Sequence, residues 1–598
     1  MDQNKIRNVA IIAHVDHGKT TLVDQLFKHS GMFRENQDVT ERLMDSMDLE
    51  KERGITISAK NGSYNYKDYW INIIDTPGHA DFGGQVERVL RMADGCLLLV
   101  DAQEGPMPQT YFVLKKALSH NLPVIVVINK IDKPAARCEW VMDQVFDLFV
   151  KLNAPDELLD FPVIYASAKQ GYANFELADT ARTMAPISEI IVQRIPPPSG
   201  SPDAPLQMQV NTIDYSQYLG RMGIGKVVNG TLRVNENVVV CKRDHTIVPA
   251  RISKIFRFEC DRKVAVDSAG VGEVVAVAGI EDITVGVTFT SPENPMPLPL
   301  IEIDPPTLSM NFIPNDSPFA GLEGKFVTSR HIEERLRRET LSDVALVIEP
   351  LTDAVGYRVA GRGELHLSIL IEKMRREGYE FQVTRPQVIM KEENGKTLEP
   401  YEELTIDVDE AYKGVVIEKL GNLKGQMLDM TQDRGMARLT YKIPTRALLG
   451  FRSQFMTDTK GLGIMNYVFA EYGPHAGELV NRVNGVLISM ETCTTVAYAL
   501  FSLQERGRLF MGAGIKIYKG QIIGENARAA DMVVNPAKGK KLTNMRASGS
   551  DENVVLTPPV NMSLEDCIAY INDDELVEIT PQNIRLRKRG DANFKKRG

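Results

Sequence analysis

The chain has 598 residues, of which 43% are hydrophobic and 25% charged, and its formal net charge is −9. This length is too great for one hydrophobic core and predicts roughly four or five domains of an ordinary globular protein. No apolar run is long enough for a membrane span and the six scattered cysteines include no C-x-x-C pair, so we expect a cytoplasmic protein without a membrane partner or a structural zinc.

The first predicted element is a buried strand over residues 9–12, followed by a turn and an amphipathic helix that ends near His29. Backbone N–H groups of such a turn cradle phosphates. In this pattern Lys19 reaches the β- and γ-phosphate oxygens, and the hydroxyl of Thr20 is a Mg²⁺ ligand. Ala13 replaces the first glycine of the G-x-x-x-x-G-K-[ST] pattern, so the match taken alone is imperfect. The candidate nucleotide-binding residues of this segment are Asp16, His17, Gly18, Lys19, Thr20 and Thr21.

A second segment follows a predicted strand over residues 71–74 and contains the groups that a hydrolase needs. We expect Asp75 to hold the metal through water, and the backbone amide of Gly78 to sense the γ-phosphate. His79 stands where a residue orients the attacking water, the role that a glutamine has in Ras. A lone histidine is often only a satisfied turn residue, but its position directly after Asp-Thr-Pro-Gly favours the catalytic interpretation. Thr56 lies between the two segments, where a mobile loop would bring its hydroxyl to Mg²⁺ when the γ-phosphate is present.

A third segment selects the base. The apolar run over residues 124–128 predicts a strand that ends at the sequence Asn-Lys-Ile-Asp. The carboxylate of Asp132 can accept hydrogen bonds from the N1–H and the exocyclic amine of guanine, and adenine offers no such pair. After a further apolar run over residues 161–166, a backbone amide would reach guanine O6. Because all these runs end at one edge of a parallel sheet, where ligands of α/β proteins bind, we expect one guanine-nucleotide pocket. Its further residues are Asn129, Lys130, Ile131, Asp132, Ser167 and Ala168.

These motifs together resemble those of the translation-factor GTPases. The resemblance rests on Ala-His-Val-Asp-His-Gly-Lys-Thr from residue 13, Arg-Gly-Ile-Thr-Ile from residue 53 and Asp-Thr-Pro-Gly-His from residue 75. Over nearly all of its length the chain resembles the BipA/TypA family of ribosome-associated GTPases. The resemblance implies Mg²⁺ with GTP as the substrate. It also implies that His79 is catalytic, that the large-subunit ribosomal RNA brings it into place, and that Val15 and Ile55 flank it.

Beyond the nucleotide domain, two proline clusters at residues 196–202 and 292–306 predict linkers. The short alternating strands between them predict an antiparallel β-barrel, with Gly220, Gly223, Gly225 and Gly230 serving turns and bulges rather than a ligand. The resemblance implies that this barrel leans on the small ribosomal subunit.

Residues 307–390 predict the order strand, helix, strand, strand, helix, strand, with helices near 329–340 and 364–377 and strands near 345–349 and 357–361. Residues 400–472 repeat that order, opened by a strand over 405–408 and a helix over 412–420. Both modules resemble split β-α-β units of ferredoxin-like type. The segment around His366 looks catalytic, but we interpret it as a turn and a helix start in which His366 is a satisfied residue.

The predicted fold class is therefore a multidomain α/β and β protein. Its predicted domains are a P-loop GTPase domain (1–200), a translation-factor-type β-barrel (201–304), two ferredoxin-like α+β domains (305–392 and 393–477) and a family-specific C-terminal domain that contacts RNA (478–598).

A polar loop in the C-terminal segment contains cations, hydroxyls and an amide that can bind phosphates, sugars and base edges of RNA. Its composition alone favours a solvated basic loop, and the absence of aromatic residues gives no support for base stacking. The resemblance favours contact with the acceptor end of A-site tRNA near the peptidyl transferase centre. The candidate RNA-contacting residues are Lys540, Lys541, Thr543, Asn544 and Arg546.

We interpret the chain as a ribosome-associated, ribosome-stimulated GTPase, and the resemblance implies a monomer that binds both ribosomal subunits, ribosomal RNA and A-site tRNA. The family role is assembly of the large (50S) subunit and translation under stress or at low temperature, and the resemblance suggests guanosine tetraphosphate as a competitor. One alternative is an elongation or peptide-release GTPase. The near-contiguity of the two ferredoxin-like modules argues against it, since elongation factor G has a decoding-site domain between them. Another is an RNA-binding assembly scaffold whose GTPase times its release.

Overall fold

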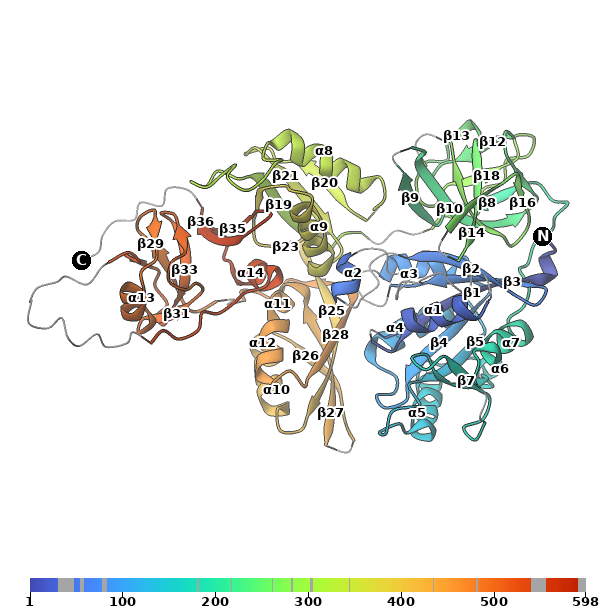
Figure 1. The fold of residues 1–598 in the computed structure, drawn as a ribbon, viewed down its shortest axis with the longest axis horizontal. Coiled ribbons are helices and arrows are strands. Elements are labelled where there is room, and N and C mark those ends of the chain that lie inside the picture. The colour runs from blue at the N-terminus through green and yellow to red at the C-terminus, as the bar shows by residue number, and fades with distance from the viewer. Residues whose placement is uncertain are drawn as a thin grey trace, which may run out of the picture. The chain divides into compact units, whose positions relative to one another are not determined.

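The computed structural model divides into two compact units, one of Met1–Asp304 with Leu341–Val344 and one of Pro305–Thr340 with Ala345–Gly598 (Figure 1). The structure describes residues 1–14, 16–30, 48–53, 59–77, 83–179, 182–216, 218–260, 262–280, 283–301, 305–343, 345–433, 435–479, 482–538 and 555–589. In those ranges no helix is both long enough and apolar enough to cross a membrane.

The first unit begins with a seven-stranded sheet in the order β2-β3-β1-β4-β5-β6-β7. Its five central strands are parallel, and only the edge strands β2 and β7 run antiparallel to their neighbours. Helices cover both faces of a parallel sheet, so its strands are nearly continuous apolar runs. The strands predicted from such runs are confirmed. The strands are β1 (Ile6–Ala13), β2 (Lys60–Tyr66), β3 (Tyr69–Asp75), β4 (Gly95–Asp101), β5 (Val124–Asn129), β6 (Val163–Ser167) and β7 (Tyr172–Asn174).

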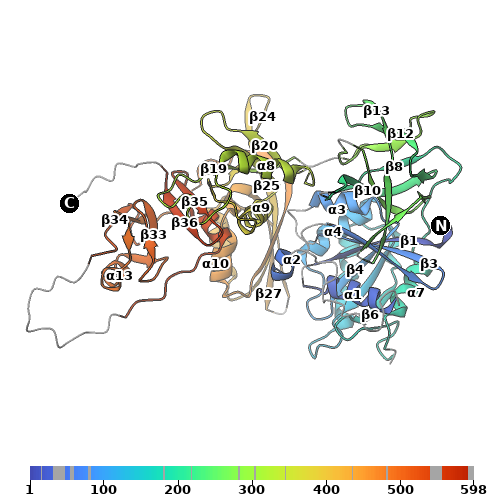
Figure 2. The same cartoon turned by 45° about the horizontal axis from the view of Figure 1, so that its top comes forward.

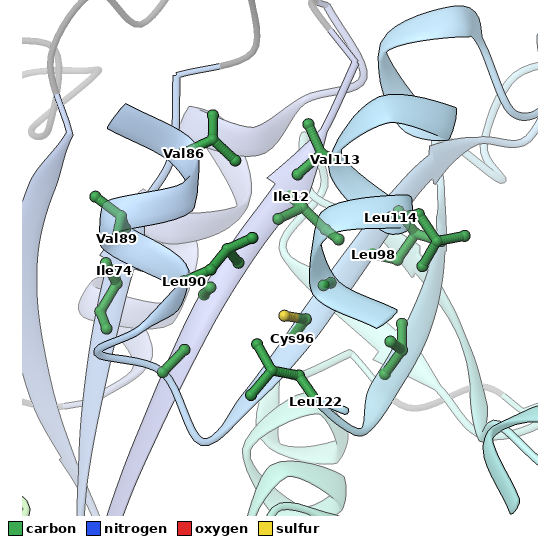
Figure 3. Close-up of a cluster of buried hydrophobic side chains, with 14 of the residues drawn as sticks. Ile12, Ile74, Val86, Val89, Leu90, Cys96, Leu98, Val113, Leu114 and Leu122 are labelled. Carbon is green, nitrogen blue, oxygen red and sulfur yellow. The ribbon is translucent and has the colours of Figure 1, made fainter. Parts of the chain in front are cut away.

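Alternate strand residues face opposite sides of this sheet, and each side has its own hydrophobic core. On one side Val89 of α3 and Leu114 of α4 belong to one cluster with Ile74 and Leu98 of the sheet (Figure 3). On the other side Ile11 belongs to a cluster with side chains of α1 and α7. The helices are α1 (Lys19–His29), α2 (Asp48–Arg53), α3 (Gly83–Leu90), α4 (Pro108–Ser119), α5 (Cys138–Lys151), α6 (Asp156–Leu159) and α7 (Ala185–Arg194), preceded by the 3-10 turn η1 (Gln3–Lys5).

An antiparallel nine-stranded sheet follows in the same unit, as predicted (Figure 2). Gly225 allows the close approach of two of its strands, because a Cβ there would lie 1.9 Å from the carbonyl oxygen of Gln209. The strands are β8 (Gln207–Gln209), β9 (Thr212–Ser216), β10 (Gly220–Asn229), β12 (Asn237–Cys241), β13 (Ile247–Arg251), β14 (Lys254–Glu259), β15 (Arg262–Val266), β17 (Val274–Ala278) and β18 (Thr288–Thr290), with a separate pair β11 (Leu232–Arg233) and β16 (Ser268–Ala269).

Polar bonds and a shared core join this antiparallel sheet to the nucleotide domain. The side-chain amide of Asn8 donates to Asp94 Oδ2 at 2.7 Å and to the carbonyl oxygen of Gly272 at 3.0 Å. Lys226 of β10 pairs with Asp94 Oδ1 at 2.9 Å. Phe258 of β14 belongs to the same apolar cluster as the helices α3 and α4. The two domains therefore form one compact unit.

The second unit contains an eleven-stranded sheet that runs from the first α+β module into the C-terminal segment. The join is the antiparallel pair β22 and β35, with Gln382 opposite Glu578. Both predicted helices of this first module are confirmed, as α8 (Ser329–Thr340) and α9 (Glu364–Arg376). His366 is buried, and its Nδ1 accepts the backbone N–H of Arg362 at 3.3 Å, as expected of a satisfied residue.

The strands of this sheet are β19 (Leu308–Pro314), β20 (Val347–Pro350), β21 (Tyr357–Gly361), β22 (Phe381–Val383), β23 (Gln387–Val388), β29 (Val486–Ser489), β31 (Gly507–Leu509), β33 (Gln521–Asn526), β34 (Met532–Val534), β35 (Glu575–Ile579) and β36 (Ile584–Lys588). The C-terminal segment adds the helices α13 (Ala497–Gln504) and α14 (Leu564–Tyr570) and the strand pair β30 (Cys493–Thr494) and β32 (Lys516–Ile517).

The second α+β module is a five-stranded antiparallel sheet with helices on one face. Its first long strand extends well before the predicted residues 405–408, and its first helix is close to the predicted residues 412–420. The elements are β24 (Lys391–Glu393), β25 (Lys396–Asp409), α10 (Lys413–Asn422), β26 (Gln426–Asp433), β27 (Met436–Pro444), α11 (Thr445–Leu448), α12 (Phe451–Asp458) and β28 (Ile464–Pro474).

Candidate functional site

The carboxyl ends of β1, β3, β4, β5 and β6 meet at one edge of the parallel sheet. Ala13 is opposite Leu99, and Asn129 lies between Asp101 of β4 and Ala166 of β6 in the strand register. The loops that follow these strands contain the predicted motifs. The sequence therefore placed these motifs correctly in the fold, at neighbouring strand ends.

The phosphate loop has the backbone that its residue types favour. Asp16 and Gly18 have φ values of 65° and 95°, in the left-handed region. A Cβ at Gly18 would lie 2.5 Å from Asn129 Nδ2, so only glycine fits this close approach. Gly18 is also the N-cap of α1 and makes no side-chain cap, and the backbone N–H groups in the first turn of a helix point out of its N-terminus. Thr21 lies one residue further along α1 with an exposed side chain.

Asn129 joins three of the predicted segments. Its amide nitrogen donates to the carbonyl oxygen of His17 at 2.8 Å, and its amide oxygen accepts the backbone N–H of Ala168 at 2.9 Å. The side chain is 1% exposed. Asn129 thus fixes the phosphate loop against the loop after β6.

Asp132 is exposed and its carboxylate is oriented by a neighbour. The hydroxyl of Ser167 donates to Asp132 Oδ1 at 2.6 Å, and the same hydroxyl oxygen accepts the N–H of Gln170 at 3.3 Å. The N–H of Ile131 donates to the carbonyl oxygen of Ala166 at 3.3 Å, which ties the two loops together. An ionised carboxylate has further acceptor positions beyond the one that Ser167 occupies.

Lys19 contacts the carboxylate of the second predicted motif. Its Nζ lies 2.9 Å from Asp75 Oδ1 and also donates to the carbonyl oxygen of Thr76. Asp75 is 1% exposed, and its Oδ2 receives no hydrogen bond from the described residues. The buried carboxylate of Asp75 and the hydroxyl of Thr20 in the first turn of α1 are oxygen donors of the kind Mg²⁺ prefers, so these residue types fit that ion.

The sequence interpretation missed Asp101, which is fully buried at the end of β4. Lys130 Nζ lies 2.7 Å from Asp101 Oδ2 and donates to the carbonyl oxygen of Asp16 at 2.5 Å. Burial raises the pKa of Asp101, but hydrogen bonds from Lys130, from the N–H of Gln103 and from Lys133 outweigh burial and hold that pKa at about 2. The available signal was an aspartate directly after the apolar run of β4.

Several predicted site residues lie outside the described residues, so the structure assigns them no geometry. They are Val15, Ile55, Thr56, Gly78 and His79 of the nucleotide domain and Lys540, Lys541, Thr543, Asn544 and Arg546 of the C-terminal loop.

A doubly wound parallel sheet with Gly-Lys-Thr and Asn-Lys-Ile-Asp segments at its strand ends, followed by an antiparallel sheet and two α+β modules, defines a GTPase of the translation-factor class. Family models agree along the chain. The matches are the elongation factor Tu GTP binding domain (residues 4–197), elongation factor Tu domain 2 (220–290), the elongation factor G C-terminus (396–483) and the TypA/BipA C-terminal domain (484–593).

Relatives are similar over nearly the whole chain. The large ribosomal subunit assembly factor BipA of Synechocystis is 54% identical over 584 residues, covering 98% of both chains. Its counterparts in Salmonella typhimurium and Haemophilus influenzae are 52% and 53% identical, each covering 98% of this chain and 96% of the relative. The chain belongs to the BipA family and is a GTP-hydrolysing enzyme.

A solved structure is similar at the level of fold. The crystal structure of ttk003000868 from Thermus thermophilus has a TM-score of 0.54 and 16% identity, covering 79% of this chain and 98% of that chain. At this identity the likeness shows the fold alone.

Proposed function

We propose that this chain is a ribosome-dependent GTPase that acts as a translation factor and large (50S) subunit assembly factor, hydrolysing GTP to GDP and phosphate on the ribosome. The observation with most weight is the convergence of Lys19, Asn129 and Asp132 at one sheet edge, in a chain at least 52% identical to proteins named large ribosomal subunit assembly factor. We extend the proposal to stress and low temperature as the conditions in which the function matters.

In the proposed mechanism the chain's residues bind and orient GTP. Asp132 accepts the guanine N–H groups, while the first turn of α1 and Lys19 bind the phosphates. Lys19 would exchange the carboxylate of Asp75, 2.9 Å away, for phosphate oxygens. That exchange would free Asp75 to act, through water, with Thr20 and Thr56 in holding Mg²⁺. Mg²⁺ supplies neutralisation of the charge on the phosphate oxygens.

His79 is the proposed catalytic residue. It would orient the attacking water, and the Gly78 amide would detect the γ-phosphate, so hydrolysis requires both the nucleotide and the loop in place. Ribosomal RNA would complete this arrangement, so we expect slow turnover by the chain alone.

The proposed partners are both ribosomal subunits, ribosomal RNA and A-site tRNA, with the loop around Lys541 and Arg546 as the tRNA contact and the protein acting as a monomer. Guanosine tetraphosphate is a proposed competitor, since it offers the same guanine and two phosphates to the same pocket.

The order of the modules favours assembly over elongation. In the described stretch 345–433, β23 of the first α+β module ends at Val388 and β24 of the second begins at Lys391. The decoding-site domain that separates these modules in elongation factor G therefore has no counterpart at this position. An RNA-binding scaffold with GTPase-timed release is the remaining alternative, and it predicts the same precursors.

Depletion of the protein, followed by a sucrose-gradient profile of ribosomal particles, tests this proposal. Accumulated large-subunit precursors that disappear when the wild-type chain is restored are the expected result. Stalled polysomes with normal free subunits would instead show an elongation function. Restoring a His79→Ala chain tests the scaffold alternative. If the GTPase only times release, this variant should bind the large-subunit precursors and remain bound to them.

A further inference from the structure

The end of β4 and the turn that follows it contain two acidic side chains, Asp101 and Glu104, that belong to none of the nucleotide motifs. Asp101 ends β4 beside Asn129 at the end of β5. Its Oδ1 accepts the backbone N–H groups of Gln103 at 2.7 Å and Glu104 at 3.3 Å, and the N–H of Gly105 donates to its carbonyl oxygen at 3.0 Å. The backbone of its own turn therefore fixes this carboxylate.

The second oxygen of Asp101 holds two ammonium groups. Lys130 Nζ lies at 2.7 Å and Lys133 Nζ at 3.2 Å. The two lysines differ in what else they touch, because Lys130 also donates to the carbonyl oxygen of Asp16 at 2.5 Å. Lys130 has a φ of 66°, a conformation that a non-glycine residue adopts only when its surroundings hold it there. One ammonium thus connects β4, the base-reading segment and the phosphate loop.

Glu104 provides a second connection from the same turn. Its Oε2 lies 3.6 Å from Nε2 of His17, whose side chain is 0% exposed. Nδ1 of the same ring lies 3.3 Å from the carbonyl oxygen of Leu99 in β4. The pKa of Glu104 is lowered, chiefly by its side-chain interaction with His17. Two consecutive residues of the phosphate loop are therefore linked to this acidic pair, Asp16 indirectly through Lys130 and His17 directly through Glu104.

We propose that Asp101 is a positioning residue for nucleotide binding. It keeps Lys130 on the phosphate loop and so fixes the base-reading residues 129–132 relative to that loop. Glu104 helps to hold the same loop through its contact with His17. The inference rests on the nucleotide site proposed above. It adds a residue that touches no nucleotide but sets the spacing of the two elements that read its base and its phosphates.

The expected effect is on nucleotide affinity. Hydrogen bonds to charged groups stabilise the arrangement that binds the nucleotide. Losing the Asp101 carboxylate should therefore raise the dissociation constant for GDP by about 10- to 100-fold. Glu104 has a 43% exposed side chain, so solvent screens its contact with His17 and its loss should raise that constant by only about 2- to 5-fold. The intrinsic kcat at saturating GTP should stay within about twofold, since neither residue meets the reacting atoms.

The test measures binding of a fluorescent GDP analogue to the full chain. Asp101→Asn keeps the size and the oxygen that accepts the turn N–H groups while removing the charge. Lys133→Met is the matched control, because Lys133 binds the same Asp101 oxygen without a described contact to the phosphate loop. A double variant, Asp101→Asn with Lys130→Met, should bind about as weakly as Lys130→Met alone, because the two residues act as one unit.

The inference is overturned if Asp101→Asn binds GDP like the wild type, or if its effect adds fully to that of Lys130→Met. It is equally overturned if Lys133→Met weakens binding as much as Lys130→Met does, and this comparison stands even if Asp101→Asn fails to fold. Asp132→Asn in the same assay tests the underlying site. If Asp132→Asn switches the base preference while Asp101→Asn binds GDP with unchanged affinity, the nucleotide site stands and only the positioning role of Asp101 is refuted.

Discussion

Replacing Asp132 by asparagine changes the hydrogen bonds that the site offers to a base and leaves the size of the side chain almost unchanged. In the structure Ser167 donates to Asp132 Oδ1 at 2.6 Å, which fixes the plane of the carboxylate. In the proposed complex two acceptor oxygens would face the N1–H and the exocyclic amine of guanine. Asparagine presents one acceptor and one donor instead, so the amine of guanine meets an N–H group. Xanthine has a carbonyl at that position and should bind in its place.

The magnitude follows from the bonds lost. Losing the charge-assisted hydrogen bond to the guanine amine costs about 1.5–3 kcal/mol, and leaving that amine against another donor costs about 1–3 kcal/mol more, which together is about 3–6 kcal/mol. Guanine-nucleotide affinity should therefore fall by roughly 10²- to 10⁴-fold, with a gain for xanthine nucleotides.

Competition of GTP, XTP and ATP against a fluorescent GDP or XDP analogue measures this preference. Asp147→Asn, an exposed aspartate of α5, is the matched control and should leave the preference unchanged. An Asp132→Asn chain that still prefers GTP would refute the assignment of the base-reading carboxylate.

Three further predictions concern catalysis, RNA contact and acid stability. His79→Ala should keep GTP affinity and lower ribosome-stimulated turnover by about 10²- to 10⁴-fold, as measured by phosphate release, and near-normal turnover would contradict its role. Changing both Lys541 and Arg546 to alanine should weaken co-sedimentation with ribosomes and leave nucleotide affinity unchanged. The slope of log binding constant against log salt concentration should flatten by roughly 0.7–0.9 for each lost phosphate contact. Salt curves that superimpose on those of the wild type would show that the loop is only solvated. The pKa of Asp101 is lowered from 3.8 to about 2, so its ionisation stabilises the fold above its unfolded pKa, and that stabilisation is lost as the pH falls towards 2. The difference in unfolding free energy between the wild type and Asp101→Asn should therefore be constant above about pH 5 and shrink below it, and a difference independent of pH in urea titrations would contradict this.

The parallel sheet and its site could be predicted because local sequence determines them. Buried parallel strands are apolar runs, and the motif that follows each run must lie at the same sheet edge. The bonds of Asn129 to His17 and Ala168 follow from that placement. Asp101 escaped prediction because an aspartate after a strand is ordinary, and its partners Lys130 and Lys133 follow a different strand.

Long-range pairing explains what the sequence could not predict in the second unit. Gln382 and Glu578 are opposite one another in neighbouring strands, although they lie far apart along the chain, and no local pattern encodes that choice. Glu578 is buried and accepts hydrogen bonds from Asn315 at 3.0 Å and Ser317 at 2.9 Å, which stabilises the join. The early part of β25 was missed for a similar reason. Its alternation is broken by Pro400 and by charged residues, and pairing with β27 and β28 decides its conformation.

Phosphate release from GTP, followed as the concentration of ribosomes is raised, tests the central claim most directly. The account predicts slow turnover by the full chain alone and a rise to a plateau as ribosomes are added, with ATP giving no comparable signal. Turnover that is independent of ribosome concentration, or equal for ATP and GTP, would contradict a ribosome-dependent GTPase.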